Sequence, residues 1–339
     1  MASEAKYHHL VPQTYMSAWA NQSGTILCKD MTSGEVGEKN KEKICGLNHY
    51  HSIIAGMPLC TEEDVQTIFA ALNHYDVYYD GKKINDYLEL NRLYYDFDNW
   101  EIKRKTDGSP VSKKVVRDAI DQAKIRDIET LWSTKYENKW PDIRSEIENK
   151  VLQESGAIPE FQKDFLMKFY ISMDWRGFAL DPLFVDAFDK IGNSILEMDK
   201  IDIPPDEREL PFFETMADYF RHCLLLKMYR QFLNEEGPIY THAIESILHT
   251  SFHFLIADGQ TKFYTSDNPS FTCLLEDGTK VGLMPVTPRI LLAQGKQSDQ
   301  ASKYYITHIT DEAVQKYNRY IEKNAEHYLI MDNSVCKTT

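Results

Sequence analysis

The chain has 339 residues, of which 42% are hydrophobic and 12% are aromatic, and this apolar content excludes an intrinsically disordered protein. Its formal net charge of -14 disfavours nonspecific electrostatic binding of DNA or RNA, although a local basic patch is still compatible with this charge. The six cysteines form no CxxC pair, the first residues lack the apolar run of a signal peptide, and no stretch approaches the roughly 20 apolar residues of a membrane span. We therefore expect a cytoplasmic protein that does not enter a membrane. The chain has no P-loop, GxGxxG, GxSxG or HExxH motif, which removes most support for nucleotide kinases, Rossmann oxidoreductases, α/β-hydrolases and zincins.

Strands are expected at both ends of the chain. The sequence predicts a first pair of strands, which consists of residues 24–29 and a return strand that starts at residue 35 after a turn. A further short strand is expected over residues 50–54. Near the C-terminus, Asp258-Gly259 and Asp277-Gly278 each predict a hairpin turn. The strands expected in this part cover residues 251–257, 262–265, 272–275, 280–284, 289–293, 304–307 and 328–331, with a helix over 311–326 that Thr310 caps.

The middle of the chain is expected to be helical. Thr61 followed by three acidic residues predicts a capped helix start, and Gly177 predicts a helix end. A sheet must cover its apolar face, so we predict one domain over residues 1–339 with an α+β fold, and separate domains are the alternative. In it, residues 1–60 and 245–339 form a mostly antiparallel sheet, and the helical region 61–244 packs on that sheet. The other expected helices cover residues 112–135, 159–176, 212–233 and 239–248.

The first candidate site is the N-terminal segment that contains His8 and His9. Adjacent residues of an extended segment point in opposite directions, so the two rings are not expected to share one metal ion. Either ring could be a metal ligand or a general base near neutral pH. The alternative interpretation is a polar N-terminal stretch that Tyr15 and Trp19 anchor to the core.

The second candidate site is Thr265-Ser266-Asp267-Asn268-Pro269. Asn268 precedes a proline and is therefore held extended, while Asp267 and Ser266 are residue types that close local turns. A stiff turn at a strand end would present a carboxylate, a hydroxyl and an amide together, which suits metal coordination or substrate orientation. The alternative is that these side chains only stabilise the turn.

The third candidate is Arg176, the last residue of the helix expected over 159–176. At about 100° per residue, Arg176 lies on the same face as Phe165 and Phe169. An arginine on an apolar face needs a partner, because an unpaired buried charge is costly. That partner is either a carboxylate or carbonyl of the chain, or a phosphate or carboxylate of a ligand.

Several of these segments together resemble an uncharacterised bacterial family of domains of unknown function, DUF 4238. The resemblance is carried by His9-Leu10-Val11-Pro12-Gln13-x-Tyr15-Met16, by Thr265-Ser266-Asp267-Asn268-Pro269 and by Pro285-Val286-Thr287-Pro288. Arg176 fits the arginine that ends the central helix of that family. The resemblance implies that His9, Arg176, Asp267 and Asn268 belong to one site, and it implies a role in defence against phage for some members of the family.

These observations lead to two functional hypotheses. The first is a metal-dependent hydrolase or nuclease that acts on nucleic acid or nucleotide phosphates. In it, Asp267 and His9 hold Mg²⁺ or Mn²⁺ or act as bases, and Asn268 orients the substrate. His8, Ser266 and Arg176 bind the substrate, with Arg176 on a phosphate. The second hypothesis is a non-catalytic sensor, ligand-binding or protein-interaction module that pairs with a second copy or with another defence protein.

Overall fold

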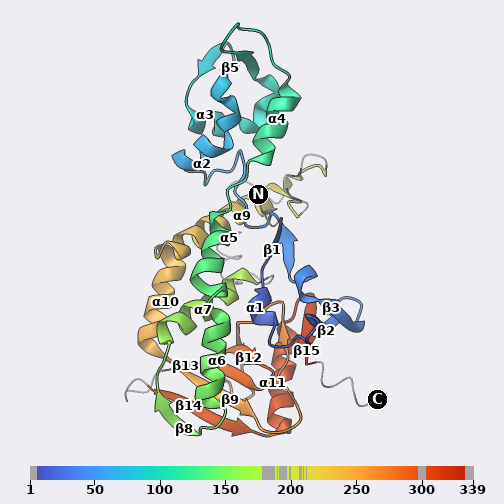
Figure 1. Ribbon diagram of the computed structural model, residues 1–339, viewed down its shortest axis with the longest axis vertical. Coiled ribbons are helices and arrows are strands. Elements are labelled where there is room, and N and C mark those ends of the chain that lie inside the picture. The colour runs from blue at the N-terminus through green and yellow to red at the C-terminus, as the bar shows by residue number, and fades with distance from the viewer. Residues whose placement is uncertain are drawn as a thin grey trace. The chain divides into compact units, whose positions relative to one another are not determined.

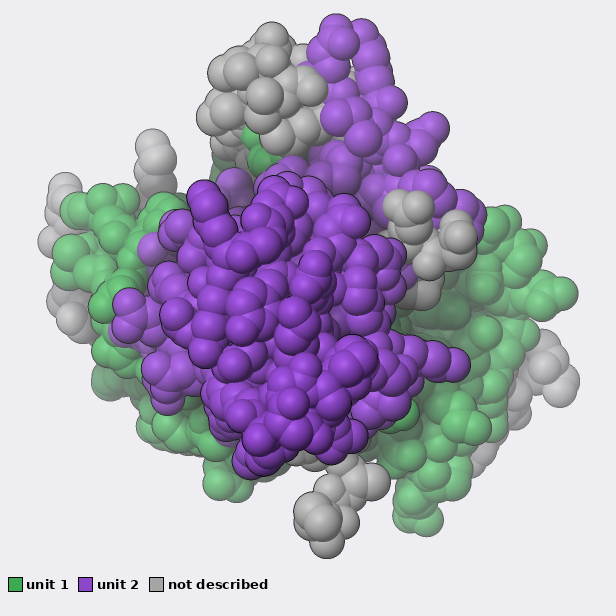
Figure 2. Space-filling model, turned by 90° about the horizontal axis from the view of Figure 1, so that it is seen from above, with its two compact units in different colours: residues 1–50, 131–190, 235–339 green, residues 51–130, 191–234 purple. Residues whose placement is uncertain are grey.

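The structure is a computed structural model that describes residues 6–177, 212–296 and 303–332 and, between them, residues 188, 190, 197, 200–205, 208 and 210. The chain divides into two compact units (Figure 2). Unit 1 consists of residues 1–50, 131–190 and 235–339, and unit 2 of residues 51–130 and 191–234. Both units combine helices with sheets that are largely antiparallel, so the predicted α+β class is confirmed.

The two ends of the chain share one sheet in unit 1, as the sequence predicted. In this sheet every neighbouring pair of strands is antiparallel. The return strand follows a turn in which Gly34 has a φ of 75°, a conformation that favours glycine. The strand order is β10 (Thr265–Ser266), β15 (Tyr328–Met331), β2 (Thr25–Asp30) and β3 (Val36–Asn40).

Most C-terminal strands form a second, six-stranded sheet, whereas a single layer was expected. Its neighbouring strands are antiparallel except for β9 and β14, which are parallel. The strand order is β11 (Phe271–Leu274), β12 (Lys280–Thr287), β13 (Ile290–Lys296), β9 (Thr250–Ala257), β14 (Lys303–Ile309) and β8 (Gly156–Pro159).

One of the two predicted hairpins occurs. The Asp277-Gly278 turn joins β11 to β12, with Leu274 opposite Lys280. The hairpin at Asp258-Gly259 was a wrong prediction, because β9 pairs with β13 and β14 instead. The Asp311 carboxylate accepts the N–H of Thr261 at 2.7 Å and fills the space that a side chain at position 259 would occupy. The turn is therefore held against a helix and does not fold back on β9.

The helices of unit 1 pack through aromatic side chains. Trp140 stacks on Phe169 with ring centroids 4.2 Å apart, and α7 lies beside α10 (Figure 1). The predicted helix start at Pro159 was wrong, because Pro159 pairs with Lys303 of β14 and α7 begins at Lys163. The helices are α1 (Gln13–Met16), α6 (Trp140–Val151), α7 (Lys163–Arg176), α10 (Gly237–His249) and α11 (Asp311–Asn324).

Unit 2 contains a small sheet that the sequence analysis missed, because this region was expected to be helical. Its strand order is β6, β5, β7, and it covers a core that includes Phe69, Phe97 and Trp100. The helix expected over 112–135 is interrupted, because Ile125 forms backbone hydrogen bonds with Ile53. The elements are α2 (Glu62–Ile68), β5 (Tyr75–Tyr79), β6 (Lys82–Ile84), α3 (Tyr87–Arg92), β7 (Glu101–Arg104), α4 (Lys113–Gln122), the start of α5 (Asp127–Trp132) and α9 (Met216–Leu233).

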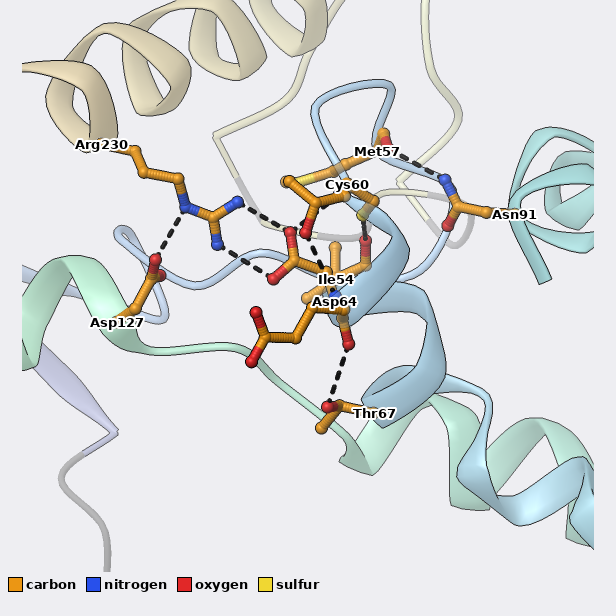
Figure 3. Close-up of polar contacts among 10 residues, drawn as sticks. Ile54, Met57, Cys60, Asp64, Thr67, Asn91, Asp127 and Arg230 are labelled. Carbon is orange, nitrogen blue, oxygen red and sulfur yellow. Dashed lines mark hydrogen bonds and ion pairs between the residues drawn. The ribbon is translucent and has the colours of Figure 1, made fainter. Parts of the chain in front are cut away.

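An arginine cross-links three segments of unit 2 (Figure 3). Arg230 of α9 donates to both carboxylate oxygens of Asp64, at 2.7 and 3.1 Å, and to Asp127 at 2.7 Å. Asp64 also accepts the N–H of Thr61 at 2.9 Å, which completes the predicted cap of α2. Burial alone would raise the pKa of Asp64, but the Arg230 guanidinium and the Thr61 amide outweigh it and hold that pKa below its ordinary value.

Candidate functional site

The N-terminal histidines lie on the short strand β1 (Tyr7–His9), which pairs with β4 (Gly46–Asn48). His8 is buried and His9 is partly exposed, as the alternation of a strand requires. His9 lies opposite Gly46, where any larger residue would overlap the His8 carbonyl. The two rings thus point in different directions, as the sequence predicted.

The turn of helix that follows β1 connects the segments that carry the family resemblance. The Tyr15 hydroxyl donates to the Pro285 carbonyl at 2.5 Å and lies 2.9 Å from the Thr265 hydroxyl. The Trp19 indole donates to the Phe263 carbonyl at 2.9 Å. Tyr15 and Trp19 therefore anchor the N-terminal segment to the core, and the side chain of Gln13 stays beside the His9 ring, with nitrogens 3.4 Å apart.

Arg176 is 1% exposed at the end of α7 and reaches the N-terminal segment. Its guanidinium donates to the His9 backbone carbonyl at 2.6 Å and to the Glu137 carboxylate at 2.7 Å, and it lies over the Trp132 ring at 4.6 Å. The Arg176 Nε–H has no acceptor among the described residues. The predicted need for a partner is met by the chain itself, and one of the three guanidinium nitrogens makes no hydrogen bond to the described residues.

Glu137, which the sequence analysis did not identify, belongs to a π-helical turn over Ser133–Glu137. Its second carboxylate oxygen accepts a hydrogen bond from Ser133 at 3.3 Å, and its side chain is 17% exposed. Single π-helical turns inside helices occur frequently at functional sites. The only sequence signal for Glu137 was the requirement that a buried arginine finds a carboxylate.

The side chain of Asp267 is fully buried and points into the protein. Its carboxylate accepts the N–H groups of Glu326, His327 and Tyr328 at 3.0, 2.7 and 3.3 Å, and the His327 ring lies 3.2 Å away. Burial raises the pKa of Asp267 above its ordinary value, and the backbone amides of Glu326, His327 and Tyr328 oppose this shift. Asp267 therefore holds the connection between α11 and β15.

The neighbouring side chains of Ser266 and Asn268 stabilise the same turn, at residues 265–269. The Ser266 hydroxyl accepts the N–H of Asn268 at 3.1 Å and donates to its carbonyl at 2.9 Å. The side chains of Asn268 and Asn324 each donate to the other's backbone carbonyl, at 3.1 and 2.9 Å. The side-chain oxygen of Asn268 also fills the space beside Gly177, so it lies next to the C-terminal end of α7, the helix that carries Arg176.

The structure thus brings most of the predicted residues together in unit 1, but it buries them. Arg176 binds the His9 carbonyl, and Gly177, the residue after Arg176, abuts Asn268. Among the described residues, neither Asp267 nor His9 belongs to a set of three donor side chains that are close enough to share one ion. Of the predicted site residues, His8, Arg176, Ser266, Asp267 and Asn268 are at most 3% exposed, and His9 alone is partly exposed.

These features define an α+β protein in which a buried arginine joins an N-terminal histidine strand to a π-helical turn. Residues 7–334 match the family model described as Protein of unknown function (DUF4238), and the chain belongs to this family, as its sequence motifs indicated. No curated protein and no solved structure matches the chain. Every helix in the described part of the chain is too short or too polar to cross a lipid bilayer.

Proposed function

We propose that the protein is an anti-phage defence enzyme that binds a phosphate group of a nucleotide or nucleic acid at the arginine cluster, which consists of His9, Glu137 and Arg176. The supporting observation is the unused Nε–H of Arg176, a side chain that is 1% exposed. A buried guanidinium with a spare donor favours an anionic ligand, because charge-assisted hydrogen bonds to phosphate are strong.

The phosphate would approach Arg176 from the side of Glu137, whose side chain is 17% exposed. It would replace the Glu137 carboxylate as the anionic partner of the guanidinium. Glu137 lies in a π-helical turn, a departure from the regular α-helix that is frequent at functional sites. The partly exposed His9 ring, which Gln13 adjoins, would then carry the proton that hydrolysis requires.

This proposal does not assign a metal ion to Asp267. Its carboxylate already receives three backbone N–H groups, and in the described part of the chain it belongs to no set of three donor side chains that could share one ion. Mg²⁺ or Mn²⁺ enters the proposal only as an ion that accompanies the substrate phosphates, which is the usual way such ions reach phosphoryl-transfer sites. Asp267 and Asn268 would hold the turn at residues 265–269 in place beside Gly177.

The test uses the full chain and three variants. Calorimetry with inorganic phosphate and nucleotides should detect binding that Glu137→Gln strengthens, because the competing carboxylate loses its charge. His9→Ala should keep that binding and the melting temperature, and should lower hydrolysis of a phosphodiester probe by about 100-fold. Glu148→Gln, an acid on α6, is the matched control and should change neither. Absence of phosphate binding in both the native protein and Glu137→Gln would refute the proposal.

A second candidate function is ligand binding without turnover, by a sensor or partner of another defence protein. The burial of Arg176, Ser266, Asp267 and Asn268 favours it, because their polar atoms are largely paired within the chain. This alternative predicts binding of phosphate or nucleotide with no hydrolysis in the presence of Mg²⁺ or Mn²⁺. Light scattering of the same samples would reveal whether a second copy is recruited.

A further inference from the structure

Unit 2 contains two adjoining cavities that the proposed function does not use. The larger one has a volume of about 550 Å³ and lies between α2 and the segment that leads into α3. The smaller one has a volume of about 130 Å³, and Asn85 and Tyr87 line both. The larger volume falls within the range that is typical of small-molecule sites.

The two cavities have opposite electrostatic character. The charged residues that line the larger cavity are Glu62 and Asp86, and neither forms an ion pair within the described part of the chain. Glu62 is the first residue of α2, and Asp86 is the N-cap of α3. With two carboxylates and no lysine or arginine among the described residues of its lining, the larger cavity favours a cation.

The smaller cavity is lined by Lys83 and Lys105 together with Asp76. Asp76 lies 2.9 Å from the Lys83 ammonium and offsets its charge. Lys105 donates to the backbone carbonyl of Asn73 at 2.9 Å, which leaves its positive charge without a carboxylate. One net positive charge therefore faces the smaller cavity, which favours an anionic group.

The walls between the two charges are held in place by the chain's own hydrogen bonds. The Asp86 carboxylate accepts the N–H of Leu88 at 2.9 Å and so caps α3. The Tyr87 hydroxyl donates to the Asn73 side chain at 2.6 Å, and the Tyr87 ring packs on Phe69. A site with this degree of preorganisation loses little entropy when it binds a ligand.

We propose that unit 2 binds a zwitterionic ligand of the short-peptide kind, with its ammonium group toward Glu62 and Asp86 and its carboxylate toward Lys83 and Lys105. The amide side chains of Gln66 and Asn85 supply the donors and acceptors that a peptide backbone needs. This inference goes beyond the proposed function, because it concerns another unit and another ligand chemistry.

The experiment titrates the full chain with triglycine at low ionic strength and follows binding by NMR shifts or calorimetry. N-acetyl-triglycine lacks the cation and triglycine amide lacks the anion, so each capped form should bind about fivefold more weakly, as the loss of one exposed charge pair implies. Raising the salt concentration should weaken the binding of uncapped triglycine most.

Variants identify the two charged ends. Asp86→Asn keeps a good helix cap but removes the charge, so it should weaken triglycine binding about fivefold and leave binding of the acetylated form unchanged. Lys105→Met should weaken triglycine binding similarly, without affecting the amide form. The controls are Glu63→Gln, which neighbours Glu62 without lining the cavity, and Lys103→Met, whose ammonium pairs with Glu101 outside both cavities.

Three results would overturn the inference. They are no saturable binding at millimolar triglycine, equal binding of the free and capped peptides, and an equal loss of affinity in the control variants. None of these measurements involves phosphate or His9, so their failure and the failure of the phosphate proposal are independent.

Discussion

The two units each contain a buried or half-buried arginine that joins segments far apart in sequence, and the two arginines are satisfied differently. Arg230 meets two carboxylates, with three short contacts to Asp64 and Asp127. Arg176 meets one carboxylate, from Glu137, and one carbonyl, and its Nε–H has no acceptor among the described residues. A fully paired arginine is sufficiently explained by folding, whereas a partly paired one keeps the capacity to bind an anion.

The largest effect is expected from Arg230→Met. This change leaves Asp64, with a side chain 8% exposed, and Asp127 without their cation, so the free energy of unfolding should fall by about 3 kcal/mol. Urea unfolding would measure it. The double variant Arg230→Met/Asp64→Asn should recover part of the loss, because it removes one orphaned charge. A loss below about 1 kcal/mol in the single variant would contradict a structural role for Arg230.

The second prediction concerns Asp267, which we place in the scaffold of the arginine cluster. In Asp267→Asn, one acceptor oxygen becomes an N–H₂ group that faces the amides of 326–328. Leaving such donors unpaired should cost about 2 kcal/mol of unfolding free energy. Denaturant unfolding of this variant and of the exposed control Asp277→Asn would test it. If Asp267→Asn abolished activity and kept the native stability, Asp267 would belong to the chemistry instead.

Local patterns in the sequence were sufficient for much of the fold. Thr61 and Thr310 cap their helices as predicted, since the hydrogen bonds that define a cap lie within a few residues. Gly177 ends α7, and the Asp277-Gly278 hairpin forms. The Asp258-Gly259 turn has the same local signal and failed, because the contact with Asp311 that redirects it comes from 50 residues away.

The candidate site was only partly predictable for the same reason. The helical face of Arg176 correctly indicated burial, and the spacing of His8 and His9 correctly indicated opposite directions. Glu137 was missed because its pairing with Arg176 spans 39 residues and depends on a π-helical turn. The inward orientation of Asp267 was also missed, since its three amide partners follow it by about 60 residues.

The third prediction tests whether the arginine cluster and the turn at residues 265–269 act as one unit. A side chain at position 177 would overlap the Asn268 oxygen, so Gly177→Ala should cost about 1–2 kcal/mol through overpacking. If the turn at residues 265–269 positions Arg176 for an anion, Gly177→Ala should also weaken phosphate binding. The loss of binding affinity should exceed what the loss of unfolding free energy alone explains. The matched control is Gly295→Ala, where the added carbon meets open space. Equal phosphate affinity in both variants would show that this turn does not position Arg176.

The smallest effect is expected at an exposed ion pair of unit 1, and it depends on pH. His308 lies 2.5 Å from the Asp258 carboxylate and 2.8 Å from the Glu154 carbonyl. These two acceptors raise the pKa of His308 above its ordinary value of 6.5, the Asp258 carboxylate most. A raised folded-state pKa stabilises the protein below pH 6.5, and this contribution is lost as the pH rises through the raised value.

Since the His308 side chain is 29% exposed and that of Asp258 is 55% exposed, the contribution should be only about 0.5 kcal/mol. Thermal unfolding across this pH range would measure it, and His308→Gln should remove it. His253 of β9 should show the opposite pH dependence and serves as an internal control. Burial lowers the pKa of His253, so its contribution to the stability of the fold is lost as the pH falls. A pH profile that His308→Gln leaves unchanged would show that exposed pairs in this protein, unlike the Arg230 pairs, do not stabilise the fold measurably.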